Sequence, residues 1–147
     1  MMALDRRALH ATAAAAAITG GVYGWFRYFG QRMGDFGPEP SAWQGLWQHL
    51  HVLAAPLLLF MLGVVVRGHL MLKLRKGQRE GKRTGLALGL LIAPMALSGY
   101  GIQVATDAGW HLALAWIHGV SSLIFVAGYL VHLVAIWRYR RVAGEEA

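Results

Sequence analysis

The seven histidines are the residues in this chain of 147 residues whose type and position could carry chemistry. Four of them fall inside long apolar runs: His10, His51, His118 and His132. The other three lie nearer the ends of such runs: His49, His69 and His111. Imidazole nitrogens are metal ligands and the axial ligands of many haem irons. Ionisable residues within apolar runs are costly to bury, so these histidines predict a metal centre.

His118 and His132 form the most informative pair. They lie 14 residues apart in one apolar run, which on a helix places them within roughly 40° of one face and about 21 Å apart. Two flat macrocycles stacked across a bilayer need this geometry. Ser121, Ser122 and Gly128 lie around the same face, and small residues let a helix approach a bulky ring. The alternative is that each histidine only hydrogen-bonds to a neighbouring helix.

The elements that must position these histidines are four apolar runs. The chain is 56% hydrophobic and 14% charged, against about 25% charged residues in ordinary soluble domains. The predicted membrane spans cover about residues 8–29, 47–72, 84–105 and 110–138. Each is near or above the roughly 20 residues that cross a bilayer. The first run could instead be a signal peptide, but it continues through Trp25 and Phe26, which suits an anchored helix.

Short connections join the predicted spans. Residues 30–43 are rich in glycine and proline, which is typical of turns, and residues 73–83 hold six Lys or Arg. Only residues 106–109 separate the third span from the fourth. We therefore expect an all-α fold, a four-helix transmembrane bundle with up-down-up-down packing. Residues 1–147 would form a single membrane domain, and no internal repeat is evident in the sequence.

The basic residues predict the orientation. Eleven of the fourteen Lys and Arg residues fall on one side of the predicted spans, and only Arg27 and Arg32 fall on the other. Because basic loops stay in the cytoplasm, both termini are expected inside, in a multi-pass protein of the bacterial inner membrane. The net charge of +7 sits at the ends of apolar runs, where it meets lipid headgroups. Nucleic acid is therefore not an expected partner.

This orientation gives each histidine a depth in the membrane. His118 lies toward the outer leaflet and His132 toward the inner leaflet. His51 matches the depth of His118, while His49 lies two residues away and so on nearly the opposite helix face. His51 is therefore preferred to His49 as the partner of His118 in an outer site, and His49 is the weaker alternative.

The inner site has two candidate partners for His132. His10 lies about one helical turn inside the cytoplasmic end of the first span, and His69 about one turn before the basic connection. The 18 residues from His51 to His69 make about five full turns, so spacing slightly favours His69. Composition and spacing leave both candidates open.

Each span also carries motifs in a defined order. They are Arg7-x-x-His10 with Thr19-Gly20, then His51 with Arg67, then Ala-Pro-Met-Ala-Leu-Ser-Gly-Tyr over residues 93–100, then His118 with His132. In this order they resemble the bacterial di-haem cytochrome b superfamily. That family includes the small prokaryotic cytochrome b-561 proteins and the cytochrome b (gamma) subunits of nickel–iron hydrogenases and formate dehydrogenases. The resemblance covers nearly the whole chain.

The resemblance implies two haem b groups, each held by two histidines. His51 and His118 would hold the outer haem, and His10 and His132 the inner haem, with His69 as the alternative to His10. The haems would be non-covalent, since the chain has no cysteine. The resemblance further implies electron exchange with membrane quinone, and a periplasmic or membrane redox partner subunit is expected. The chain would then be the electron-transfer component of a quinone-linked oxidoreductase, as a subunit of a respiratory complex.

Arg67, near the cytoplasmic end of the second span, has two interpretations. It can pair with a haem propionate through charge-assisted hydrogen bonds, or its side chain can snorkel to the lipid headgroups. Two other functions are open for the chain. It could be a cofactor-free membrane anchor or assembly subunit whose histidines donate hydrogen bonds between helices. A small transporter is disfavoured, because the spans lack acidic residues and an inverted repeat.

Overall fold

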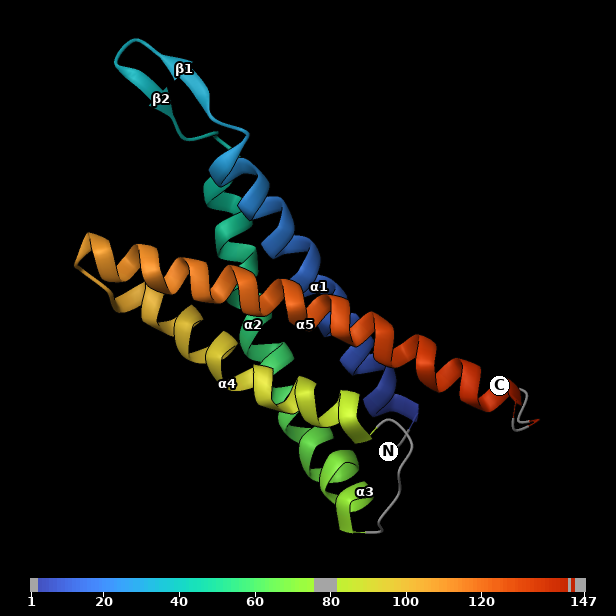
Figure 1. Ribbon diagram of the computed structural model, residues 1–147. Coiled ribbons are helices and arrows are strands. Elements are labelled where there is room, and N and C mark those ends of the chain that lie inside the picture. The colour runs from blue at the N-terminus through green and yellow to red at the C-terminus, as the bar shows by residue number, and fades with distance from the viewer. Residues whose placement is uncertain (1–2, 76–81, 143, 145–147) are drawn as a thin grey trace. The chain divides into compact units, whose positions relative to one another are not determined.

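The computed structural model describes residues 3–75, 82–142 and 144. Its main elements are long helices (Figure 1): α1 (Ala3–Tyr28), α2 (Gln44–Val65), α4 (Lys82–Val104) and α5 (Ala108–Val142). After α2 the chain continues through a π-helical turn, η1 (Val66–Leu70), into the short helix α3 (Met71–Arg75). The predicted helical fold class is confirmed.

Within the described residues, three helical segments are long and apolar enough to cross a membrane. They are Gln44–Gly68, Arg83–Val104 and Ala108–Tyr139. Their ends agree with the second, third and fourth predicted spans to within about one helical turn. The chain is therefore a membrane protein whose apolar helices contact lipid.

The helix α1 confirms the predicted first helix, but it is not one of these three segments. Its central run is mostly alanine, and its first two turns contain Asp5, Arg6 and Arg7. Polar residues such as His10 and Thr19 also interrupt the run and lower its mean hydropathy, so composition does not make α1 a clear span. That α1 also crosses the membrane, as the predicted first span, remains a prediction.

The chain divides into two compact units, Met1–Val65 and Val66–Ala147. The first unit contains α1 and α2, and the second contains α4 and α5. In each unit two consecutive helices run antiparallel and form a hairpin. The single membrane domain, the packing of four helices into one bundle and the cytoplasmic location of both termini remain predictions.

A two-stranded ribbon connects α1 to α2. Strand β1 (Arg32–Gly34) pairs antiparallel with β2 (Gly37–Glu39). Gly37 has a φ of +118°, which side chains rarely adopt, so glycine closes this turn. The side chain of Glu39 covers Gly34, where a Cβ would collide with it. The sequence indicated a turn without strands, because three-residue strands are too short to show alternation.

The first hairpin buries one stripe of each helix. The buried apolar residues are Leu9 and Ala16 of α1, and Ala54, Leu58 and Leu62 of α2. Spacings of three, four and seven residues keep side chains on one helix face. His51 precedes Ala54 by three residues and shares this face, so it is directed toward α1.

The second hairpin has a regular antiparallel register. Going along α5 away from the turn, the contacts pair Leu114 with Gly101, His118 with Met95 and Gly99, Gly128 with Leu88, and His132 with Thr84. These α5 positions recur at helical spacing, so one face of α5 packs along the length of α4. At the turn, Asp107 caps α5, because its Oδ1 accepts a 2.9 Å hydrogen bond from the Trp110 N–H.

Candidate functional site

His118 packs against α4, where it makes a hydrogen bond to a backbone carbonyl and its ring lies over a glycine. Its Nδ1 lies 2.9 Å from the carbonyl oxygen of Met95. A Cβ added to Gly99 would lie 3.0 Å from the Cε1 of His118, so the imidazole needs the space that this glycine leaves. A carbonyl can only accept, so Nδ1 carries the proton and the lone pair of the neutral ring is on Nε2.

His51 is held in the same way against α1. Its Nδ1 lies 3.1 Å from the carbonyl oxygen of Ala16 and 3.3 Å from the Oγ1 of Thr19. A Cβ added to Gly20 would lie 2.7 Å from the Cε1 of His51. The contact with a carbonyl again places the proton on Nδ1 and the lone pair on Nε2.

The helix segments on which the two histidines pack share a short sequence pattern. Residues 16–20 read Ala-Ala-Ile-Thr-Gly, and residues 95–99 read Met-Ala-Leu-Ser-Gly. In both segments the first residue offers its carbonyl to the imidazole, the fourth is a hydroxyl residue, and the fifth is the glycine under the ring. We call each segment, with its histidine, an imidazole notch.

Helix geometry explains why the notch needs this pattern. Residue i+4 stands beside the carbonyl of residue i, so a glycine there opens that carbonyl to a second donor. The hydroxyl at the fourth position turns back onto its own helix. Thr19 Oγ1 lies 2.7 Å from the Ala15 oxygen and 3.3 Å from the Ala16 oxygen, and Ser98 Oγ lies 3.2 Å from the Met95 oxygen.

His132 also contacts α4, but through a side chain. Its Nδ1 lies 2.8 Å from the Oγ1 of Thr84, and both residues are half-buried. A hydroxyl can either donate or accept, so this contact does not by itself place the proton on the ring. Like His118, His132 lies on the α5 face that packs on α4.

The other predicted site residues are placed less fully. His10 is half-buried on α1, in the first unit, and Arg67 is exposed in η1. His69 lies in η1, but its side chain lies outside the described residues. Each predicted haem pair joins a histidine of one unit to a histidine of the other, apart from the His69 alternative, so these pairs remain predictions.

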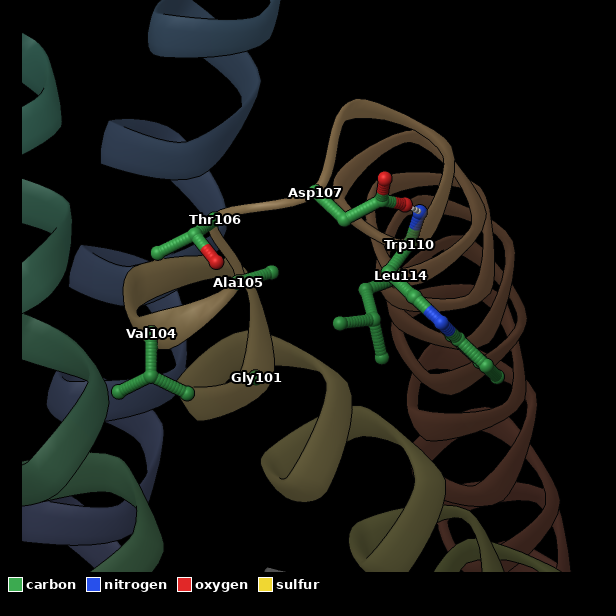
Figure 2. Close-up of a pocket in the computed structure, with 7 residues that line it drawn as sticks. All are labelled: Gly101, Val104, Ala105, Thr106, Asp107, Trp110 and Leu114. Atoms are coloured by element: carbon green, nitrogen blue, oxygen red, sulfur yellow. Dashed lines mark hydrogen bonds between the residues drawn. The ribbon is translucent and has the colours of Figure 1, made fainter.

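An open hollow of about 310 Å³ lies at the α4–α5 turn of the second unit (Figure 2). Its lining consists of Gly101, Val104, Ala105, Thr106, Asp107, Trp110 and Leu114. Figure 2 shows the carboxylate of Asp107 directed at the Trp110 backbone, where it caps the helix. Its acidic group is thus engaged in a structural role, and we assign no chemistry to the hollow.

Sequence reasoning missed the residues that orient the histidines. It placed Thr19-Gly20 and residues 93–100 in the family resemblance without connecting them to the histidines, and it did not single out Thr84. The repeated pattern of a small or flexible residue, alanine, a branched apolar residue, a hydroxyl residue and glycine was the available signal. No protein-family model, curated protein or solved structure matches this chain.

Proposed function

We propose that the chain is a transmembrane di-haem b-type cytochrome that passes electrons between the membrane quinone pool and a redox partner. One observation carries this proposal. Both hairpins hold an imidazole with its Nδ1 on a backbone carbonyl and its lone pair on Nε2. Metal-ligating histidines have this arrangement, because the hydrogen bond at one ring nitrogen fixes the tautomer and orientation for the other.

The chemistry of the donor set fits a b-type haem. His51, His118 and His132 are half-buried on apolar helices, and a haem iron can take two imidazoles as its axial ligands. Without cysteine in the sequence, attachment would be non-covalent. When bound, haem b supplies an iron that alternates between ferric and ferrous states. Ligation by two histidines leaves no position for substrate on the iron, which favours electron transfer over catalysis at the metal.

The proposed function assigns a role to each candidate residue. His51 and His118 would ligate the outer haem, with their rings set by the notches, and His132 with His10 the inner haem. Arg67 would pair with a propionate or with lipid headgroups. Both termini would face the cytoplasm of a bacterial inner membrane. A periplasmic partner subunit would dock near Trp43, Trp47 and Trp110, beside the outer haem. The complex would form part of a respiratory oxidoreductase.

Electron exchange with quinone is a first expected result. A quinol analogue should rapidly reduce the oxidised protein, or a quinone analogue should rapidly oxidise the reduced protein. Haem absorbance after stopped-flow mixing measures either reaction. The reason is that a quinone resides in the bilayer and can reach a haem edge between helices. Lack of exchange in both directions, with native partners present, would remove the quinone from the proposal. The electrons would then pass between two protein partners.

The choice between His10 and His69 gives a second expected result. We expect His10→Ala to lose the inner haem and His69→Ala to keep it, because the order of motifs places a ligand in the first span. Haem content of the purified single variants measures this directly. The reverse outcome would make His69 the ligand and confirm the preference that spacing alone gave.

A second candidate function is a cofactor-free membrane anchor. The hydrogen bonds of His51, His118 and His132 to neighbouring helices also suit this role, because interhelical hydrogen bonds help helices associate in lipid. The glycine beneath two of the rings and the shared tautomer accompany these hydrogen bonds and therefore fit both functions. A reduced-minus-oxidised visible spectrum separates the two functions, since the anchor would show no haem bands.

A further inference from the structure

Thr84 makes a side-chain hydrogen bond to the third anchored histidine. Its Oγ1 lies 2.8 Å from the Nδ1 of His132. The contact lies near the start of α4 and 14 residues along α5 from His118, far from the α4–α5 turn. It therefore fixes His132 separately from the notch that holds His118.

The chemistry of this contact differs from that of the two notches. His51 and His118 meet carbonyl oxygens, which only accept, so their tautomer is fixed. A threonine hydroxyl allows two states. If His132 donates from Nδ1, its lone pair lies on Nε2, as in the notches. If Thr84 donates to Nδ1, the ring proton lies on Nε2, which then cannot serve as a ligand.

We infer that Thr84 accepts the Nδ1 proton of His132 and is a positioning residue for this histidine. The inference rests on the proposed function, in which His132 ligates a haem through Nε2. An acceptor at Nδ1 raises the basicity of the ligating nitrogen. A more basic ligand stabilises ferric iron, so Thr84 lowers the midpoint potential of the haem that His132 holds. The two notches use backbone oxygens, whereas this contact depends on a replaceable side chain.

Two variants of Thr84 test the role in the haem-loaded full chain. Thr84→Val keeps the branched shape and removes the hydroxyl, whereas Thr84→Ser keeps the hydroxyl. We expect Thr84→Val to weaken the binding of one haem about tenfold or more. The midpoint potential of that haem should rise in a redox titration. Thr84→Ser should keep both the haem affinity and the midpoint potential of the wild type. Thr106 is an exposed threonine at the α4–α5 turn. The matched control Thr106→Val should change neither the haem affinity nor the midpoint potential.

The tautomer itself can be read without haem. The full chain is labelled with ¹⁵N-histidine and produced in haem-deficient cells. NMR couplings between the ring nitrogens and the protons on the ring carbons then identify which nitrogen is protonated. The His132 signal is the one that His132→Gln removes. We expect the proton on Nδ1 in the wild type, and a proton on Nε2 would overturn the inference.

The two measurements separate this inference from the proposed function. A full chain that binds no haem under any condition would end the proposed function, while the tautomer would still decide the role of Thr84. If the chain binds two haems and Thr84→Val leaves both affinities and both potentials as in the wild type, Thr84 is no positioning residue and the proposed function stands.

Discussion

Replacing either His118 or His51 with alanine is expected to remove the same one of two haems. Both rings present Nε2 from equivalent notches, and we assign both to one iron. Each single variant should therefore fall from two haems per chain to about one, as measured by pyridine haemochrome. The double variant should lose no more than either single variant, because the second replacement removes a ligand from an iron that is already lost.

Two other histidines provide matched controls for this experiment. His49 lies two residues from His51 and is exposed, and His111 lies seven residues before His118. Alanine at either position should leave both haems in place. If the double variant His51→Ala/His118→Ala retains no haem while each single variant retains one, the two histidines serve different irons and the pairing is wrong.

The glycines of the notches should matter almost as much as the histidines. In Gly20→Ala the new methyl would lie 2.7 Å from the Cε1 of His51, and in Gly99→Ala it would lie 3.0 Å from that of His118. Each ring must then shift from the position in which its Nδ1 meets the carbonyl oxygen. Loss of such a supporting contact weakens metal binding about 10- to 100-fold, so we expect each variant to bind the outer haem that much more weakly in a haem titration.

Helix stability cannot explain such a loss. Alanine is favoured over glycine inside a helix by about 0.8–1 kcal/mol, so both substitutions should strengthen the helix that carries them. Gly21→Ala and Gly119→Ala are the matched controls, because a Cβ at either position meets nothing within 4 Å. If all four variants bind haem equally well, the imidazoles are not held by the notches in the loaded protein.

The helices were predictable because their apolar runs carry an unambiguous signal. The second, third and fourth runs became helices whose ends shifted by at most about one turn. The first run became a helix as well, but the polar residues and glycines among its alanines lower its mean hydropathy too far to establish a span. The strands β1 and β2 gave no signal, since their form depends on glycine conformations and on pairing across the turn.

The candidate site was predictable only in part. The histidines stood out because an imidazole in an apolar run has few other reasons to be there. Their partners did not, because the oxygens of Ala16 and Met95 belong to the backbone and have no side-chain signature. Thr84 meets His132 only through the register of α4 against α5, which a separation of 48 positions in the sequence does not reveal. The notch pattern over residues 16–20 and 95–99 was readable, but five residues are short enough to pass as chance.

The haem content of the intact protein tests the central claim most directly. A pyridine haemochrome assay on the purified full chain, referred to protein concentration from quantitative amino-acid analysis, counts non-covalent haem b without assuming a partner or a quinone. The proposal predicts two haems per chain, both extracted by acidic acetone. One haem per chain would contradict the pairing of four histidines, and none would leave the histidines as hydrogen-bond donors in a cofactor-free membrane protein.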